Sequence, residues 1–209
     1  MTKLTIIEHP ILQHKLTILR KKETKSSEFR SLLNEMSGLL AYECTKDLPV
    51  TTIDIETPLE KTQGKVVNEE PMVVSIMRAG NAMIDGILNI LPFASVGHIG
   101  IYRDKFTQNT VEYYFRLPDE PTGRSVILAD PLLATGDTAI ACLDRLKQYN
   151  VGSIKMICVL VSKEGVNKVH HFHPDVEIIT ICQERAFTDD GYLLPGIGDA
   201  GDRLYKLQT

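Results

Sequence analysis

The sequence predicts an α/β fold with a mostly parallel sheet flanked by helices. Two observations indicate this class. From about residue 70 onward, short apolar runs alternate with segments whose apolar residues recur at helical spacing, the order of β-α-β units. The 209 residues, 43% of them hydrophobic and 24% charged, also suffice for a sizeable core. We therefore expect a single domain over residues 1–209.

The first half of the chain carries two predicted helices and three predicted strands. Apolar residues spaced by three and four predict a helix over 29–40, with one of the two serines just before it as the cap. Alternation predicts a strand over 50–55, and an apolar run predicts another over 72–76. Residues 82–91 fit a helix that ends at a proline, and 96–102 fit a strand.

Residues 103–124 have a different composition. They are polar, contain the aromatic group Tyr113-Tyr114-Phe115, and end in prolines and a glycine. We interpret the segment as a β-arm or flap outside the central sheet. Its aromatic residues could form a lid over a substrate or a dimer contact, and the enrichment of aromatic residues at interfaces favours the contact.

The second half of the chain alternates strands and helices. A continuous apolar run predicts a strand over 126–129 that is buried on both faces. Residues 138–149 follow it directly as an amphipathic helix. A strand over 155–162, a helix over 163–172 and a strand over 176–182 complete the pattern.

The bulk properties limit the partners. The formal net charge of −4 argues against a nucleic-acid surface, since phosphate neutralisation needs clustered Lys and Arg. No apolar run approaches the roughly 20 residues of a membrane span, and the first residues hold no signal-peptide core. We expect the four cysteines to be buried free thiols of a reducing cytoplasm: Cys44, Cys142, Cys158 and Cys182.

Three histidines gather near the end of the predicted helix over 163–172. They are His170, His171 and His173. A metal site normally needs supporting Cys or Asp at ligand spacing, so we expect these side chains to act as cations at a helix C-terminus.

The loop after the strand over 126–129 is the most informative part of the chain. Asp130 follows the strand, and a Thr-Gly-x-Thr turn then enters the next helix. Free N–H groups at a helix N-terminus, the hydroxyls of Thr135 and Thr138, and the helix dipole together favour an anion. The pattern indicates a phosphorylated sugar, with phosphate on the loop and sugar hydroxyls on Asp130.

Two arginines follow neighbouring predicted strands, where the ligands of open parallel sheets bind. Arg78 could hold a diphosphate by paired hydrogen bonds, with Gly80 allowing close approach of the backbone. A surface arginine in an ordinary turn explains the same residues equally well. Arg103, at the end of the strand over 96–102, is the weaker indication.

Four motifs resemble those of uracil phosphoribosyltransferases, a branch of the type I phosphoribosyltransferases. The loop over 130–138 resembles the phosphoribosyl-diphosphate (PRPP) loop of type I enzymes. Three further stretches resemble the uracil branch: Arg78-Ala79-Gly80-Asn81-Ala82-Met83-Ile84-Asp85-Gly86, Gly100-Ile101-Tyr102-Arg103, and Gly191-Tyr192-Leu193-Leu194-Pro195-Gly196-Ile197-Gly198-Asp199-Ala200-Gly201-Asp202-Arg203. The resemblance covers nearly the whole chain, and its last motif is absent from the purine enzymes.

This resemblance implies a pyrimidine-salvage reaction in which uracil and PRPP give UMP and diphosphate. It implies Mg²⁺ that is bound with PRPP and has no direct protein site. It also implies a type I fold with a protruding β-arm, which we place at about 103–124, and a C-terminal base-binding hood at about 183–209. A homodimer or a higher homo-oligomer is expected, and GTP acts as an allosteric effector in some members of the family.

The resemblance also implies roles for individual residues. Asp130 is expected to bind the ribose hydroxyls, Arg78 and Arg103 the diphosphate, and Asp199 the PRPP side of the site. These four are the expected catalytic residues. The other expected PRPP contacts come from the loop: Pro131, Leu132, Leu133, Ala134, Thr135, Gly136, Asp137 and Thr138. Uracil recognition is expected largely from main-chain groups of Leu193, Gly198, Asp199 and Ala200.

Three positions depart from the family pattern. Ser75 stands where proline is usual, and Asn81 where leucine is common. Asp137 stands where glycine is usual, which brings a carboxylate into a phosphate loop. Two like charges 4 Å apart repel by about 1 kcal/mol in water and about 4 kcal/mol at an effective dielectric of 20. We expect Asp137 to point toward solvent and to weaken PRPP binding modestly.

Three other functions remain as alternatives. A non-catalytic nucleotide or PRPP sensor on the same fold is conceivable because of Asp137. An RNA-binding regulator would need a basic face, which the net charge and the scattered Lys and Arg do not suggest. A purine transferase is disfavoured by the motif over 191–203.

Overall fold

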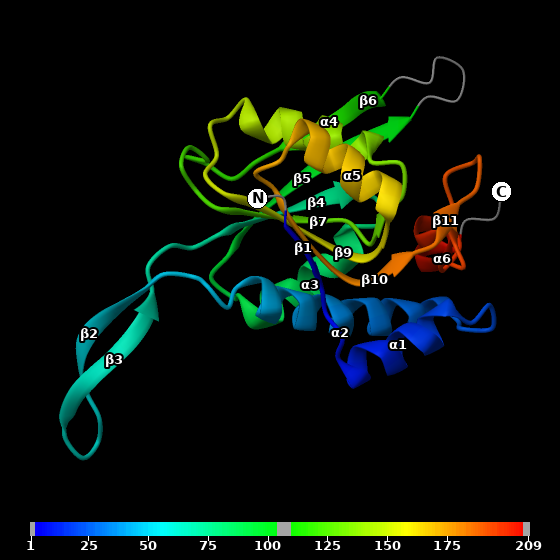
Figure 1. The fold of residues 1–209 in the computed structure, drawn as a ribbon. Helices are drawn as coiled ribbons and strands as arrows, with labels where there is room; N and C mark the ends of the chain where they lie inside the picture. The colour runs from blue at the N-terminus through cyan, green and yellow to red at the C-terminus, as the bar shows by residue number, and fades with distance from the viewer. Residues whose placement is uncertain (1–2, 104–109, 207–209) are drawn as a thin grey trace.

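The computed structural model describes residues 3–103 and 110–206 and centres on an eight-stranded sheet. Its strands are β1 (Lys3–Ile6), β4 (Met72–Met77), β5 (Ser95–Arg103), β6 (Thr110–Arg116), β7 (Val126–Ala129), β8 (Leu132–Leu133), β9 (Ile154–Ser162) and β10 (Glu177–Glu184). Their order is β1-β10-β9-β7-β4-β5-β6, with β8 paired to β9 (Figure 1). All pairings are parallel except that of β5 with β6. The predicted α/β class is confirmed.

Helices cover both faces of this sheet (Figure 1). The described helices are α1 (Pro10–Arg20), α2 (Ser26–Cys44), α3 (Asn81–Ile90), α4 (Asp137–Lys147), α5 (Lys163–Phe172) and α6 (Ala200–Tyr205). On one face α2 packs on β9 and β10 and contacts α1 and α3, whereas α4 and α5 pack on β5, β9 and β10 from the other face.

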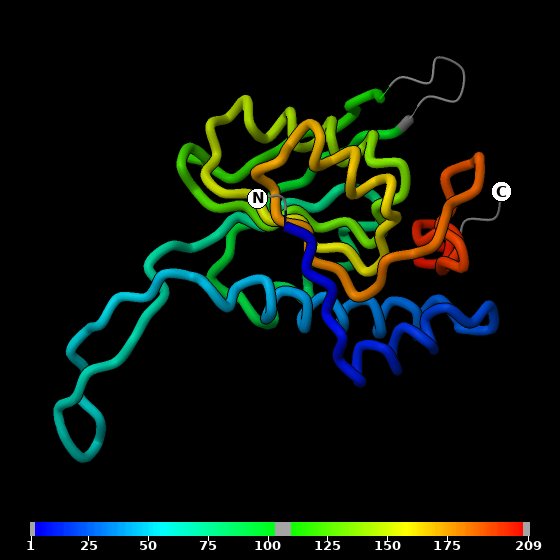
Figure 2. The backbone as a smooth tube through the Cα atoms, in the orientation of Figure 1, coloured from blue at the N-terminus to red at the C-terminus, as the bar shows by residue number. Residues whose placement is uncertain are grey.

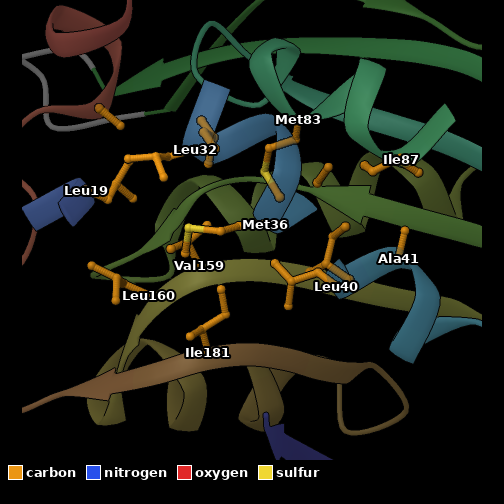
Figure 3. Close-up of a cluster of buried hydrophobic side chains, with 14 of the residues drawn as sticks. Leu19, Leu32, Met36, Leu40, Ala41, Met83, Ile87, Val159, Leu160 and Ile181 are labelled. Atoms are coloured by element: carbon orange, nitrogen blue, oxygen red, sulfur yellow. The ribbon is translucent and has the colours of Figure 1, made fainter. Parts of the chain in front are cut away.

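The core has two halves because successive strand residues point to opposite faces of the sheet. Val73 and Ile127 belong to the cluster beneath α1, α2 and α3, part of which Figure 3 shows. Val74 and Leu128 belong to the cluster beneath α4 and α5. All four side chains are almost fully buried, so β4 and β7 are the apolar centre of the fold.

β4 and β7 are parallel neighbours in the sheet, and the direction in which later strands are added reverses between them. From β4 the chain passes through α3 to β5 on one side, and from β7 it passes through α4 to β9 on the other. Such a switch point leaves a crevice beyond the carboxyl ends of the two strands, where ligands of α/β sheets bind.

Most predicted helices and strands agree with the structure within a few residues, but the predicted cap of α2 is wrong. Lys25 is the N-cap residue, and its side chain makes no capping hydrogen bond. Ser26 and Ser27 are the first two helical residues. The helix depends instead on its apolar face, which includes the buried Phe29 and Met36.

The predicted location of the arm is also wrong. The described part of 103–124 contributes β6, which pairs with β5 as the antiparallel edge of the central sheet, and 104–109 lie outside the described residues. The segment is polar because an edge strand stays largely exposed. Phe115 stacks on Tyr149 at 5.0 Å between ring centroids, which fixes the strand on the α4 side.

The protruding arm is formed by β2 (Val50–Glu56) and β3 (Lys61–Val67). These two strands pair only with each other among the described elements, and they extend away from the sheet (Figure 2). Every residue of β2 is exposed, as is every residue of β3 except Gly64. The alternation over 50–55 correctly predicted a strand, but it carried no information on where that strand lies.

The cysteine prediction is right for three residues. Among the histidines, burial lowers the pKa of His170 and His173, which disfavours the cationic form expected for these two rings. All four cysteines are free thiols, and Cys44, Cys142 and Cys158 are buried while Cys182 is partly exposed.

Candidate functional site

A cavity of about 820 Å³ lies beyond the carboxyl ends of β4 and β7. Three parts of the chain form most of its lining: the end of β4 and the loop after it, the loop after β7 together with the start of α4, and the C-terminal region. Ile101 of β5 adds a fourth contact. In order, the lining residues are 76–79, Ile101, Asp130, 132–139, 189–192 and 199–201. The crevice expected from the strand order is therefore a real cavity.

The loop after β7 leads into α4 through a left-handed turn. Gly136 has φ of 87°, a conformation that glycine adopts without strain, and it is the N-cap residue of α4. Asp137 begins the helix, and its N–H donates to the Thr135 hydroxyl at 3.5 Å. The first N–H groups of any helix lack intrahelical partners, so this end of α4 presents donors to the cavity.

Asp130 lies in the cavity at the end of β7. Its carboxylate accepts a hydrogen bond from the Leu132 N–H at 3.5 Å. Burial raises the pKa of this carboxyl group to about 7, because the surrounding protein disfavours the charged form. A carboxylate in this position can accept hydrogen bonds from ligand hydroxyls, and a cation that binds beside it favours its ionised form.

The loop after β4 packs tightly against the end of β7. A Cβ on Gly80 would lie 2.4 Å from the Ala129 carbonyl oxygen, so only glycine allows this approach. The contact brings Arg78 to the same cavity as Asp130. The Tyr205 hydroxyl donates to the Arg78 carbonyl at 3.2 Å, which links the loop to α6.

Two of the three departures from the family pattern contact one another. The Ser75 hydroxyl donates to Asn81 Oδ1 at 2.7 Å and lies 2.8 Å from His98 Nδ1. Ser75 is fully buried in β4, Asn81 is the first residue of α3 and His98 is in β5. A polar network therefore fixes the base of the loop that carries Arg78.

The third departure, Asp137, forms an ion pair. Lys168 Nζ lies 2.6 Å from Asp137 Oδ1, and the Asp137 side chain is 28% exposed. The expectation that this side chain points to solvent is therefore wrong, since the carboxylate is directed to α5. The residue itself lines the cavity.

Helix α5 supports the loop after β7, a role that the sequence motifs did not indicate. The Ser162 hydroxyl donates to the Ala134 carbonyl at 2.5 Å and also accepts from the Gly165 N–H at 2.7 Å. A Cβ on Gly165 would lie 2.3 Å from the same Ala134 carbonyl oxygen. The one available sequence signal was a serine at the junction of a strand and a helix, which is typical of an N-cap.

The C-terminal wall of the cavity is held by two arginines from outside it. Arg20 Nη1 donates to the Gly196 carbonyl at 2.9 Å, and Arg203 Nη1 donates to the Ile197 carbonyl at 2.9 Å. Asp199 caps α6 by accepting from the Asp202 N–H at 2.9 Å. The small pairing of β11 (Ala186–Phe187) with β12 (Leu193–Leu194) precedes this segment.

Comparison of the chain with known proteins agrees with these features. The family model described as uracil phosphoribosyltransferase matches residues 6–206. The chain belongs to the uracil phosphoribosyltransferase family. A uracil phosphoribosyltransferase of Polaromonas naphthalenivorans is 51% identical over 206 residues, covering 98% of this chain and 99% of that protein. One of Rhodococcus jostii is 51% identical over 201 residues, covering 96% of each chain.

Solved structures agree with the fold of a uracil phosphoribosyltransferase family member. An Aquifex aeolicus protein matches with a TM-score of 0.93 at 32% identity, covering 99% of both chains. An adenine phosphoribosyltransferase from Trypanosoma brucei matches with a TM-score of 0.60 at 12% identity, covering 91% of this chain and 88% of that one. The second likeness concerns the fold alone, and it fits the expected type I architecture.

The cavity of this uracil phosphoribosyltransferase family member brings together most of the residues singled out from the sequence. Those that line it are Arg78, Asp130, Leu132, Leu133, Ala134, Thr135, Gly136, Asp137, Thr138, Asp199 and Ala200. Pro131, Leu193 and Gly198 are not among the lining residues. The Leu193 side chain is buried in the core beneath α2, and the Pro131 carbonyl accepts from main-chain N–H groups of β9. The side chain of Arg103 lies outside the described part of the structure.

Two further results concern metals and membranes. Among the described residues, no group of three or more His, Cys, Asp or Glu side chains is arranged to hold a metal ion. Five carboxylates do line the cavity, namely Asp130, Asp137, Asp189, Asp190 and Asp199, and oxygen ligands are those that Mg²⁺ prefers. No described helix is both long enough and apolar enough to span a membrane.

Proposed function

We propose that this chain transfers the 5-phosphoribosyl group of PRPP to uracil, giving UMP and diphosphate in pyrimidine salvage. One observation carries the proposal. A single cavity joins a helix N-terminus suited to phosphate, the Asp130 carboxylate at the end of β7, which is suited to sugar hydroxyls, and a wall from the C-terminal region. Membership of the uracil phosphoribosyltransferase family gives the same activity.

In this proposal the PRPP phosphate lies on the loop after β7. Main-chain N–H groups over 134–138 and the hydroxyls of Thr135 and Thr138 bind its 5′-phosphate. Asp130 accepts hydrogen bonds from the ribose hydroxyls in its ionised form. Arg78, from the neighbouring loop, holds the diphosphate together with Arg103.

The reaction needs stabilisation of the departing diphosphate more than it needs a protein nucleophile. The C1–diphosphate bond breaks through an oxocarbenium-like state while the pyrimidine N1 forms the new bond to C1 and loses its proton to solvent, so negative charge grows on the leaving group. Mg²⁺ bound with PRPP would supply charge stabilisation at those oxygens, and Asp199, which lines the cavity, would reach this side of the site. Arg78 stabilises the same charge, which is greater in the transition state than in the ground state.

Uracil recognition is assigned to the C-terminal segment over 183–209. The pyrimidine presents a carbonyl, an N–H and a second carbonyl along one edge, which peptide groups complement. Asp199 and Ala200 line the cavity, and main-chain groups of Leu193 and Gly198, which are not among its lining residues, complete the proposed set. Cytosine leaves a buried polar group unpaired in such a site and is rejected strongly.

A direct assay tests the proposal. Radiolabelled uracil, PRPP and Mg²⁺ are incubated with the protein, and UMP is separated chromatographically. Formation of UMP that is lost in Asp130→Asn supports the proposal. Binding of PRPP or UMP without turnover supports instead a nucleotide sensor on the same fold, and failure to bind either ligand contradicts both functions.

We also propose that the whole chain acts as one domain and assembles into a homodimer or a higher homo-oligomer in the cytoplasm. The exposed apolar side chains of the β2–β3 arm, including Val50 and Ile53, support self-association. Analytical ultracentrifugation tests the assembly, with and without GTP as a candidate effector. Nucleic acid is not proposed as a partner because of the net charge of −4.

A further inference from the structure

Asp137 has an unusual place for a carboxylate. It is the first residue of α4, its neighbour Gly136 caps the helix in a left-handed turn, and it lines the cavity. If the loop receives a phosphate dianion as proposed above, a negative charge already stands beside that position. The negative charges of the carboxylate and the phosphate repel each other and oppose binding, unless a cation offsets them.

Lys168 supplies a cation at this position. Its Nζ lies 2.6 Å from Asp137 Oδ1, with side chains that are 41% and 28% exposed. The base of the Lys168 side chain also lies against the loop, because a Cβ built on Gly136 would lie 3.6 Å from Lys168 Cβ. The ammonium group is therefore held at the loop.

The position of Lys168 is fixed by the anchoring of α5. Ser162 caps this helix and donates to the Ala134 carbonyl, and Gly165 packs against the same carbonyl. Gly136 in turn approaches the Gly165 carbonyl, at 3.1 Å from an imagined Cβ. The loop and the first turns of α5 thus behave as one unit, in which Lys168 needs little further ordering to face Asp137.

We infer that Lys168 is a positioning residue for PRPP: it neutralises Asp137 and thereby allows a phosphate loop that contains a carboxylate to bind a phosphate. The inference rests on the proposed function and deepens it. It assigns a role in substrate binding to a residue of α5, outside the motifs that carry the family resemblance. It also explains how Asp137 can occupy a position where glycine is usual.

An exposed ion pair often contributes little to stability, so the test must distinguish neutralisation of Asp137 from a purely structural role of Lys168. The prediction therefore concerns how the effect of replacing Lys168 depends on Asp137. Lys168→Ala raises the PRPP KM about tenfold, while the uracil KM stays within about twofold. In an Asp137→Asn background the same substitution changes the PRPP KM less than about twofold, since no negative charge remains to offset. Lys168→Arg retains the charge and restores most of the wild-type KM.

A matched control exists elsewhere on the fold. Lys147 forms an ion pair with Asp175 at 2.6 Å and is 36% exposed, but it lies at the far end of α4 from Asp137. Lys147→Ala therefore removes a similar pair at a distance from the cavity. It is expected to leave both KM values unchanged.

Calorimetry provides a readout that does not depend on turnover. The ratio of the uridine Kd to the UMP Kd measures what the phosphate contributes, and Lys168→Ala lowers that ratio about tenfold only when Asp137 is present. An equal effect of Lys168→Ala with and without Asp137→Asn overturns the inference but leaves the proposed function intact. Wild-type protein that binds neither UMP nor PRPP contradicts the proposed function itself.

Discussion

Arg20 Nη1 donates to the carbonyl of Gly196 at 2.9 Å, although 176 residues separate the two in sequence. The same guanidinium places Nη2 2.6 Å from Glu184 Oε1, in a charge contact rather than an aligned hydrogen bond. Glu184 is buried, with only 3% of the residue exposed. The end of α1 is therefore attached both to β10 and to the segment that forms the C-terminal wall of the cavity.

Removing Arg20 is expected to be strongly destabilising. Arg20→Ala leaves the Glu184 carboxylate buried without its partner, which costs about 3–5 kcal/mol in the free energy of unfolding. Arg20→Met combined with Glu184→Leu removes both charges and is expected to cost much less. Urea unfolding of the two variants checks this, and equal losses would count against an unpaired charge as the cause.

Arg203 is expected to affect uracil more than PRPP. It donates to the carbonyls of Leu19, Lys21 and Ile197 at 2.6–2.9 Å, and its guanidinium lies over the Phe29 ring. Arg203→Ala releases the segment that is proposed to recognise the base, so the uracil KM rises about tenfold or more while the PRPP KM changes little. Steady-state kinetics with each substrate varied in turn measures the two constants. A parallel rise in both would indicate general loosening of the fold.

The ionisation of Asp130 predicts how stability changes with pH. Burial raises its pKa to about 7, whereas an unfolded chain has about 3.9. The folded protein therefore holds more protons than the unfolded chain between these values. The stability contributed by neutral Asp130 is present below about pH 4 and is lost as the pH rises through about 7, by at most about 4 kcal/mol. Asp130→Asn is expected to raise the thermal midpoint at pH 8 and to have little effect near pH 4.

Exposed Asp54 on β2 is the control for that measurement. Asp54→Asn is expected to shift the midpoint equally little at both pH values. A gain for Asp130→Asn that is the same at pH 4 and pH 8 would be inconsistent with burial as the cause of the raised pKa.

Gly165→Ala is expected to disturb the phosphate loop. The added Cβ would lie 2.3 Å from the Ala134 carbonyl oxygen, so α5 or the loop must move. We expect the PRPP KM to rise about tenfold or more, with a loss of about 1–3 kcal/mol in the free energy of unfolding. Gly64→Ala on β3 is the matched control, because its Cβ meets only the movable Ile55 side chain. Similar kinetic effects of both variants would refute the assignment.

The sequence predicted the sheet well because the central strands are buried on both faces. The apolar run over 126–129 and the slightly longer run in β4 have this property, and so does β9. Helix α5 was predicted with its observed bounds, since its apolar residues face one side of the sheet. The cavity residues Asp130 and Arg78 could be predicted for the same reason, because each follows one of these strands.

The rest depended on contacts that no local pattern encodes. The polarity of 103–124 reflects an edge strand, and nothing in the segment itself distinguishes an edge strand from an arm. The partner of β2 could not be inferred because both strands of the hairpin are exposed on both faces. Lys168 and Arg20 act across the fold, so their relation to the cavity becomes visible only in three dimensions.

The cavity affects how local unfolding in different parts of the chain is linked. Its walls come from the region after β4, the region after β7 and the C-terminal region, and separation of any one of them dismantles it. A ligand held there thus ties the stability of distant parts of the chain together by mass action. Amide exchange in β4, β7 and α6 should slow together when nucleotide binds, while exchange in the β2–β3 arm should keep its own rate.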